Sequence, residues 1–200
     1  MEWLFFLRSK PRVIAKDIKS LKVLDKEIIK CSACPRLTSW RKEVAITKRA
    51  AYRNEDYWGK PVTGFGPSDS KLLIIGLAPG AHGANRTGRV FTGDSSGDWL
   101  YRSLHKNGLA KISTSLSSDD GQELFETRIT CALRCAPPGN KPTTIEQQTC
   151  KSWLEAEMKL LMPTLRVFLP LGQIAWKATI DALLAIRRIA EKTPKVWPWG

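Results

Sequence analysis

The sequence predicts an α/β fold, a three-layer sandwich with a central, mostly parallel sheet. Three short apolar runs, expected to be buried strands, alternate along the chain with longer segments of helical periodicity. Alternating strands and helices are typical of parallel sheets covered on both faces. The chain has 200 residues, of which 42% are hydrophobic and 26% charged, as in ordinary globular proteins with a substantial core. We therefore expect residues 1–200 to form a single domain.

The N-terminal part of the chain is basic and has a helical pattern. Within residues 1–30, expected to pack on the domain as a basic helical segment, residues 15–30 carry apolar side chains at helical spacing: Ile18, Leu21, Leu24, Ile28 and Ile29. Residues 35–70 are also basic and contain Pro61, Gly64, Gly66 and Pro67. We expect this second stretch to be irregular.

The middle of the chain begins with the clearest strand. The apolar run 72–75 is followed by Gly76, which predicts a buried parallel strand. A glycine-rich loop over 76–97, a helix over 98–106 and a Ser/Asp-rich loop over 113–121 are expected next. The helix is expected to end at Asn107 and Gly108.

The last third predicts two more strands and two more helices. A strand is expected over 127–133 and another over 165–169. Thr143 and Glu146 have the spacing of a capping box, so a helix is expected from there to about 161. A final helix is expected over 173–188. Ligands of such folds bind beyond the carboxyl ends of the strands, which here are the loops after Gly76 and Leu133 and at 170–172.

The net charge of +13, from 32 basic and 19 acidic residues, indicates a polyanionic partner. Residues 1–60 hold 15 basic and 7 acidic groups, residues 61–130 hold 7 of each, and residues 131–200 hold 10 and 5. The basic charge thus flanks a neutral centre. No apolar run is long enough to cross a bilayer, and the N-terminus does not have the pattern of a signal peptide. These observations predict a cytoplasmic protein without a membrane partner.

Five cysteines in an intracellular chain favour metal binding or reduced thiols over disulfides. Cys31 and Cys34 form a Cys-x-x-Cys pair, and Cys135 precedes Cys150 by 15 residues. Four thiolates in two groups suit Zn²⁺ or an iron–sulfur cluster. A thioredoxin-like redox pair and a set of buried, reduced cysteines are the other two interpretations. The spacing does not choose between zinc and iron–sulfur, nor does it identify the spare cysteine.

The glycine-rich loop carries the residues that suggest chemistry. It lacks the Gly-Lys-Ser/Thr of a Walker A phosphate-binding loop, and its glycines do not have the dinucleotide-binding spacing. Its small residues let backbone amides approach a flat ligand or a phosphate. Phe91 is placed to stack on a base, and Arg86 and Arg89 to contact phosphates. Asp94 is either a catalytic carboxylate or the N-cap of the next helix.

The loop resembles the first motif of type B, family 5 uracil-DNA glycosylases. The resemblance continues in other segments and covers most of residues 25–180. Its four parts are Gly76-Leu-Ala-Pro-Gly-Ala-His-Gly-Ala-Asn-Arg-Thr-Gly-Arg-Val-Phe-Thr-Gly-Asp94, Cys31-Ser-Ala-Cys-Pro-Arg-Leu37, Tyr57-Trp-Gly-Lys-Pro-Val62 with Gly64-Phe-Gly66, and Arg134-Cys-Ala-Pro-Pro-Gly-Asn-Lys-Pro142.

The resemblance implies a monofunctional DNA-repair glycosylase with a structural [4Fe–4S] cluster. The cluster ligands of the family match Cys31, Cys34, Cys135 and Cys150, which leaves Cys131 as a strand residue. The implied substrate is DNA that contains uracil. The uracil nucleotide is flipped out of the base stack and its glycosidic bond is cleaved, which leaves an abasic site. The protein is expected to act as a monomer. The implied catalytic residues are Asp94 and Asn140. The implied contacts to the base are Phe91 and the backbone of Gly76, Leu77 and Ala78. His82 lies in the same loop and is either a contact to the base or a phosphate, or a histidine that packs against its neighbours.

The sequence departs from the family pattern at two places. Related glycosylases have a polar residue where this chain has Leu77 and Ala78, which shifts the catalytic role to Asp94 and predicts tolerance of other deaminated bases such as hypoxanthine. The family also has a C-terminal His-Pro-Ser-like motif, whereas no histidine follows His105 here. The last strand and helix are therefore expected to be missing, and the 200-residue chain to be weakly active or inactive.

Other functions remain open at this level. A catalytically impaired iron–sulfur module that binds DNA is the main alternative to the glycosylase. A small electron carrier and a zinc-stabilised nucleic-acid module are the remaining two. His105 lies near an expected helix end and is interpreted as structural.

Overall fold

A computed structural model describes residues 11–192 and shows a three-stranded parallel sheet in the order β2-β1-β3. The strands are β1 (Leu72–Gly76), β2 (Thr127–Cys131) and β3 (Val167–Pro170). Leu72 pairs with Thr127 on one side and with Val167 on the other. The predicted fold class is confirmed. Strand β2 ends two residues earlier than predicted, and β3 begins two residues later than predicted.

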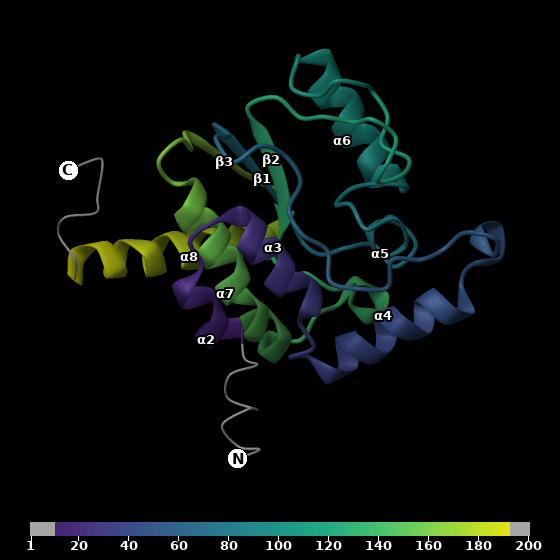
Figure 1. The fold of residues 1–200 in the computed structure, drawn as a ribbon, viewed down its shortest axis with the longest axis horizontal. Coiled ribbons are helices and arrows are strands. Elements are labelled where there is room, and N and C mark those ends of the chain that lie inside the picture. Colours follow the sequence, from purple (N-terminus) through teal and green to yellow (C-terminus); the bar gives the residue numbers. More distant parts are fainter. Residues whose placement is uncertain (1–10, 193–200) are drawn as a thin grey trace.

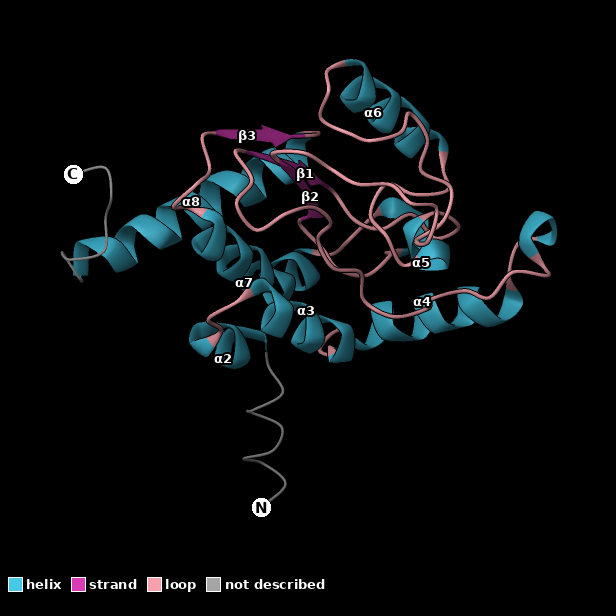
Figure 2. Cartoon of the chain, turned by 45° about the horizontal axis from the view of Figure 1, so that its top comes forward, coloured by secondary structure: helices cyan, strands magenta, loops and turns pink. Residues whose placement is uncertain are grey.

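Helices cover both faces of the sheet (Figures 1 and 2). On one face, Ile74 and Ile129 pack against Tyr101 and Leu104 of α6 (Ser95–Lys106). On the other, Leu73 and Ile75 pack against α7 and α8, whose contributing residues include Leu154, Met158, Ala175 and Ala182. The strands therefore have apolar side chains on both faces, which is why they read as continuous apolar runs.

The N-terminal segment is divided into short pieces. Helix α2 (Pro11–Ile14) and a 3₁₀ turn (Ala15–Asp17) precede α3 (Leu21–Lys30). The helix predicted over 15–30 is therefore wrong in its first third, because Ser20 is extended and its hydroxyl accepts a hydrogen bond from the Val23 amide as the N-cap of α3. Helix α3 buries Leu24 and Ile28 in a cluster with Trp153 of α7. Residues 1–10 of the expected segment lie outside the described residues.

The expectation of an irregular segment over 35–70 is wrong for its first third. Helix α4 (Pro35–Thr47) begins with a proline at its first position, where the missing amide hydrogen costs nothing. It buries Leu37, Arg41 and Val44, so a charged residue occupies the middle of its buried face. That charge conceals the helical pattern from an analysis of apolar spacing. A 3₁₀ turn (Ala50–Tyr52) follows, and 53–71 contains no helix or strand.

The remaining helices follow the predicted pattern with shifted ends. Thr143 and Glu146 form the predicted capping box at the start of α7. Helix α6 begins at Ser95, three residues earlier than predicted, and α8 extends four residues further. The glycine-rich loop contains one unpredicted turn of helix. The bounds are α5 (Ala84–Thr87), a 3₁₀ turn (Pro138–Asn140), α7 (Thr144–Leu161) and α8 (Gln173–Lys192). Among the described helices, none has the length and apolar character that a bilayer crossing requires.

A buried ionic network fastens α7 to β2 and the loop after it. Glu157 of α7 is fully buried and accepts hydrogen bonds from Arg128 at 2.6 Å and Arg134 at 2.5 Å. Thr130 donates a third at 2.7 Å. Burial raises the pKa of Glu157, but the two guanidinium charges and these hydrogen bonds outweigh it and bring the pKa to about 2. The ion pair with Glu157 therefore fixes Arg134, which directly precedes Cys135 in the loop after β2.

Candidate active site

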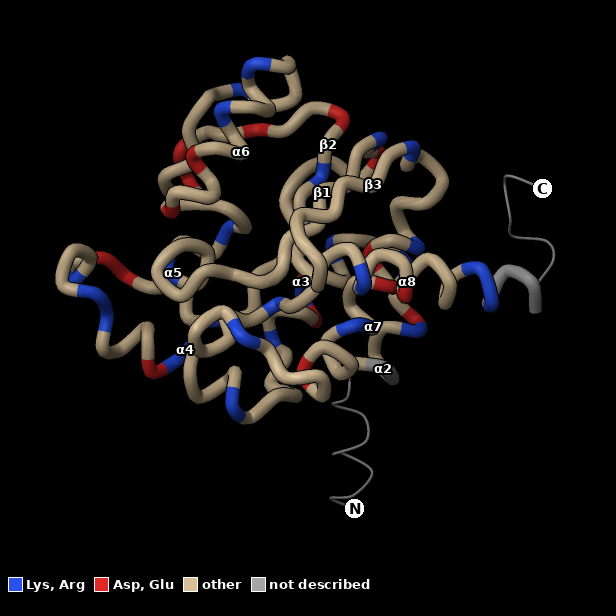
Figure 3. Tube along the Cα trace, turned by 180° about the vertical axis from the view of Figure 1, so that it is seen from behind, with Lys and Arg blue, Asp and Glu red and all other residues tan. Residues whose placement is uncertain are grey.

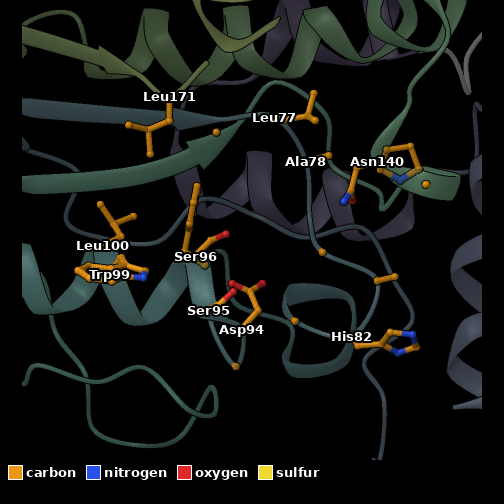
Figure 4. A pocket seen from close by; sticks show the side chains of 18 of the residues that line it. Leu77, Ala78, His82, Asp94, Ser95, Ser96, Trp99, Leu100, Asn140 and Leu171 are labelled. Atoms are coloured by element: carbon orange, nitrogen blue, oxygen red, sulfur yellow. The ribbon is translucent and has the colours of Figure 1, made fainter. Parts of the chain in front are cut away.

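A large hollow lies beyond the carboxyl end of β1 (Figure 4). Its volume is about 1050 Å³, and it is formed by the loop after β1, the start of α6, the 3₁₀ turn at Pro138–Asn140 and the residue after β3. These segments lie where parallel α/β sheets place their ligand sites. Its lining includes seven of the residues singled out from the sequence: Gly76, Leu77, Ala78, His82, Phe91, Asp94 and Asn140.

Asp94 caps a helix and also lines the hollow. One oxygen, Oδ1, accepts a hydrogen bond of 3.0 Å from the Gly97 amide and so caps α6. The other oxygen, Oδ2, lies against Gly80 and Gly83, at the lining of the hollow. The sequence left the cap and the site as alternatives for this residue. The geometry is compatible with both at once, because the two oxygens point to different neighbours.

Two glycines make room for that carboxylate. A Cβ atom on Gly83 would lie 2.0 Å from Oδ2 of Asp94, and one on Gly80 would lie 3.0 Å from it. The first distance is far shorter than any van der Waals contact, so a side chain at 83 displaces the carboxylate. The close approach of the loop to Asp94 thus depends on these two positions.

Phe91 is held at the floor of the hollow by a similar fit. A Cβ atom on Gly76 would lie 2.7 Å from Cε2 and Cζ of the Phe91 ring. Phe91 itself has a φ of 51°, in the left-handed region that a side chain rarely adopts. The ring packs on the cluster that includes Ile74 and Cys131, and the structure around it therefore fixes a strained backbone.

The opposite end of the hollow is aromatic and basic. His82 Nδ1 and Tyr57 Oη are hydrogen-bonded at 3.0 Å, and Arg49 and Tyr52 line the same end. Burial, together with the charges of Arg49 and Arg86, lowers the pKa of His82 below its ordinary value of 6.5. The imidazole is therefore neutral at neutral pH.

Asn140 is the polar side chain that reaches the hollow from the loop after β2 (Figure 4). It is exposed and has a φ of 57°, next to Gly139 at 58°. Two consecutive left-handed residues make a sharp turn, which Asn and Gly tolerate better than other residues. The loops after β1 and β2 are also joined directly, because the amides of Ala132 and Leu133 donate to the carbonyls of Gly76 and Leu77.

Four of the five cysteines line a second, small cavity: Cys31, Cys34, Cys135 and Cys150. They come from the end of α3, the N-cap of α4, the loop after β2 and α7. Cys131 is buried in β2 and does not line this cavity, as the sequence predicted. In the part of the chain that the structure describes, no three His, Cys, Asp or Glu side chains converge closely enough to hold a metal ion as they stand.

The chemistry of this cavity nevertheless fits a thiolate-bound metal centre. Its lining includes Trp153 and Arg134, whose Nε1 and Nε atoms are buried without a hydrogen-bond partner. Unpartnered buried donors are rare, and sulfur atoms in the cavity would accept from them. Burial raises the pKa of Cys34 to about 11 and that of Cys135 to about 12. The thiols of Cys34 and Cys135 are therefore protonated at neutral pH.

The sequence matches a family model and several curated proteins. Residues 63–199 match the model of the uracil DNA glycosylase superfamily. The chain belongs to this superfamily. It is 51% identical over 161 residues to the type-5 uracil-DNA glycosylase of Mycobacterium leprae, a match covering 80% of this chain and 70% of that protein. The type-5 uracil-DNA glycosylase of Thermus thermophilus is 52% identical over 155 residues, covering 78% and 68%.

The matched segment covers only part of each relative's length. The type-5 uracil-DNA glycosylase of Mycobacterium bovis is 53% identical over 150 residues, which is 75% of this chain but 56% of that protein. The match thus spans between about half and 70% of the relatives' own lengths. Among the superfamily's types, these identities place the chain in family 5, as its motifs indicated.

Two arginines that were expected to contact phosphates have partners inside the protein. Arg86 and Arg89 are buried, and their guanidinium groups are paired with Glu55 and Asp120. Arg89 also donates to Ser115 at 2.8 Å. Each guanidinium nitrogen of the two residues donates to an acceptor inside the protein, which does not favour the expected phosphate contacts. The two side chains stabilise the shape of the loop instead.

Several residues that line the hollow, or contact a residue that lines it, were not selected by sequence reasoning. Tyr57 is the hydrogen-bond partner of His82, and it lies in a motif already quoted for the resemblance. Four further lining residues come from three segments: Arg49 and Tyr52 from the 3₁₀ turn after α4, Trp99 from α6, and Leu171 from the segment after β3. Of these, only Leu171 follows from the rule for strand ends, because it comes directly after β3. Nothing in the local pattern around the other three indicates the site.

Proposed function

We propose that this chain is a monofunctional uracil-DNA glycosylase that flips a uracil nucleotide into the hollow and hydrolyses its N-glycosidic bond. The observation that carries the proposal is the placement of the Asp94 carboxylate in one hollow with Phe91 and Asn140. The relatives named type-5 uracil-DNA glycosylases support the choice of uracil. The substrate is DNA, the base leaves as a free base, and an abasic site remains.

The base binds at the floor of the hollow. The base must leave the stack to expose its glycosidic bond, which costs a few kcal/mol. Stacking on Phe91 offsets this by about 1–3 kcal/mol. The backbone at Gly76, Leu77 and Ala78 and the side chain of His82 provide contacts to the base. The neutral imidazole of His82 donates a hydrogen bond without adding a positive charge.

Cleavage of the bond develops positive charge on the sugar and negative charge on the base. The Oδ2 atom of Asp94 stabilises the cationic sugar or orients the attacking water. Asn140 holds the base or the water from the opposite side of the hollow. Leu77 and Ala78 supply no side-chain polar group, so the contacts that reject analogues are few. We therefore propose that hypoxanthine and other deaminated bases are also released.

Release of uracil from an oligonucleotide tests the proposal. We expect the 200-residue chain, which has no histidine after His105, to produce abasic sites at a low rate, detected by strand cleavage after alkali. Asp94→Asn should lower the rate about 10²- to 10⁴-fold. Asn caps a helix as well as Asp does, so its folding stability should change by less than about 0.5 kcal/mol. Asp98→Asn, an exposed change in the same helix, is the matched control and should leave the rate unchanged.

Two other results would contradict parts of the proposal. Equal rates for Asp94→Asn and the parent chain would contradict the catalytic assignment of Asp94. Retained DNA binding with no release by the parent chain would favour the catalytically impaired DNA-binding module. The absence of any histidine after His105 in this sequence motivates that second candidate.

We further propose that Cys31, Cys34, Cys135 and Cys150 hold a [4Fe–4S] cluster. Their common cavity and the unpartnered donors of Trp153 and Arg134 support it. Bound there, the cluster supplies structural cross-linking rather than catalysis. The four residues then join α3, α4, α7 and the loop after β2, and so hold Asn140 in place.

Iron content distinguishes this cluster from zinc. Anaerobically reconstituted protein should be brown and contain about four iron atoms and four inorganic sulfides per chain. Cys150→Ala should lose most of the iron. Cys131→Ala changes a cysteine that is equally buried but outside the cavity, and it should keep the iron. Colourless protein that binds one Zn²⁺ per chain would contradict the cluster.

A further inference from the structure

The hollow is larger than one base requires. Its volume of about 1050 Å³ lies at the upper end of the range for drug-sized ligands, and a pyrimidine is much smaller than such ligands. Trp99, Leu100 and Leu171 gather at one end, Asn140 and His82 lie toward the other, and Asp94 lies between them (Figure 4). The end with Trp99 is apolar and is not used by the proposed chemistry.

Trp99 dominates this end. Its side chain is 73% exposed, although tryptophan is among the largest apolar residues. The guanidinium carbon of Arg102, which is also exposed, lies over the indole ring at 5.6 Å from its centroid. An exposed indole beside a guanidinium group offers a stacking surface together with a positive charge. This is the combination that single-stranded nucleic acids bind.

We propose that Trp99 and Leu171 form a second base site, which stacks a base next to the excised one in the same DNA strand. The inference rests on the proposed function for its ligand. Trp99 follows Asp94 by five residues in the same helix, about 7.5 Å along its axis. A nucleotide adjacent to the flipped one therefore passes this end of the hollow.

A nucleic-acid strand fits this surface better than a protein partner does. The surface is continuous with the hollow that contains Asp94, so a strand whose uracil occupies the hollow crosses it. The net charge of +13 and the Arg102 side chain favour a polyanion. Stacking also requires little sequence preference in the neighbouring base, because every base has a flat face.

A binding cycle with uncleavable DNA tests the second site. The probe is a short fluorescent single strand with one 2′-fluoro-deoxyuridine, which resists cleavage. In two further probes, the 5′ or the 3′ neighbour lacks its base. Trp99→Ala should weaken binding of the complete probe about 5- to 100-fold. For the probe that lacks the stacked base, the same change should have less than a twofold effect.

Two further variants separate stacking from structural effects. Trp99→Tyr keeps an aromatic face and should restore most of the affinity. Trp176→Ala is the matched control, because Trp176 is 60% exposed on α8 and does not line the hollow. Equal weakening of all three probes by Trp99→Ala, or no weakening of any, would overturn the second site. Failure of the chain to bind the complete probe would also overturn it.

The outcome is independent of turnover. A chain that releases uracil normally but shows no coupling between Trp99 and a neighbouring base keeps the proposed function and loses this inference. A chain that binds with the predicted coupling but releases no uracil keeps the second base site and contradicts the proposed glycosylase activity.

Discussion

Asp94 shows how a single side chain joins the fold to the proposed chemistry. Its Oδ1 atom accepts a hydrogen bond from the Gly97 amide and so caps the N-terminus of α6, and its Oδ2 atom lies at the lining of the hollow. The cap fixes the χ angles of the residue, so the second oxygen is pre-oriented without a further hydrogen-bond partner. Gly83 and Gly80 then decide how closely the loop approaches that oxygen. The catalytic assignment therefore has consequences at residues that carry no functional group.

Gly83→Ala should reduce uracil release as strongly as a change of Asp94 itself. The new Cβ would lie 2.0 Å from Oδ2 and must push the carboxylate away from its position. Gly80→Ala places its Cβ at 3.0 Å, so a smaller loss is expected. We expect the rates to fall in the order parent, Gly80→Ala, Gly83→Ala, measured as single-turnover release. The reverse order would contradict the role of Oδ2.

Sequence reasoning selected the residues of the hollow but could not give their contacts. Phe91, Asp94 and Asn140 were accessible because a known motif carries them. The pairing of Tyr57 with His82 spans 25 residues, and the burial of Arg86 and Arg89 depends on Glu55 and Asp120 from other loops. Contacts of this kind are set by the packing of segments distant in sequence. No local pattern encodes them.

The elements around the hollow are held by α7. This helix contacts the N-terminal helices, buries Cys150 and Trp153, and carries Glu157 toward β2. Its start was predictable from the capping box, because that signal lies within four residues. Helix α4 was missed because Arg41 interrupts its buried face and donates to the carbonyl of Cys31 at 3.3 Å. Tertiary contacts here override the apolar pattern on which the prediction depended.

Glu157→Gln should destabilise the protein strongly. The change leaves the buried guanidinium group of Arg134 without its counter-charge and leaves Arg128 only the more distant Asp25 carboxylate at 3.7 Å, and breaking a buried ion pair typically costs about 3–5 kcal/mol. Glu155→Gln, two residues earlier, removes only a partly exposed pair with Lys151 and should cost less than about 1 kcal/mol. Urea unfolding at pH 7 measures both free energies. Equal effects of the two changes would contradict the importance of the network.

The same network predicts an acid dependence. The pKa of Glu157 is about 2 in the folded chain and about 4.5 ordinarily, so its contribution to stability is present above pH 4.5. That contribution is lost as the pH falls from 4.5 toward 2. The difference in unfolding free energy between the parent chain and Glu157→Gln should therefore shrink over this range. A constant difference down to pH 2.5 would show that the pKa is not depressed.

At the scale of the whole molecule, the net charge of +13 overstates the charge available to DNA. Among the residues whose burial the structure describes, five arginines are buried and serve internal contacts: Arg41, Arg86, Arg89, Arg128 and Arg134. Figure 3 shows the Lys and Arg positions along the chain trace, including several on α4 and the turn after it. The turn carries Arg49 to the basic end of the hollow. The charge count predicted a polyanionic partner, but only the fold shows which charges face the site.

Arg49 is the basic side chain that we expect to contact a DNA phosphate at the hollow. It is exposed, it lines the end opposite Trp99, and its charge contributes to the lowered pKa of His82. Each phosphate contact on a single strand contributes about 0.7 to the slope of log affinity against log salt concentration. Arg49→Ala should therefore weaken binding of an uncleavable strand and make this slope shallower by about 0.7. Lys159→Ala removes an exposed charge away from the hollow and should leave the slope unchanged. An unchanged slope for Arg49→Ala would mean that the strand leaves the hollow without crossing its basic end, because electrostatic contacts release counterions wherever they form.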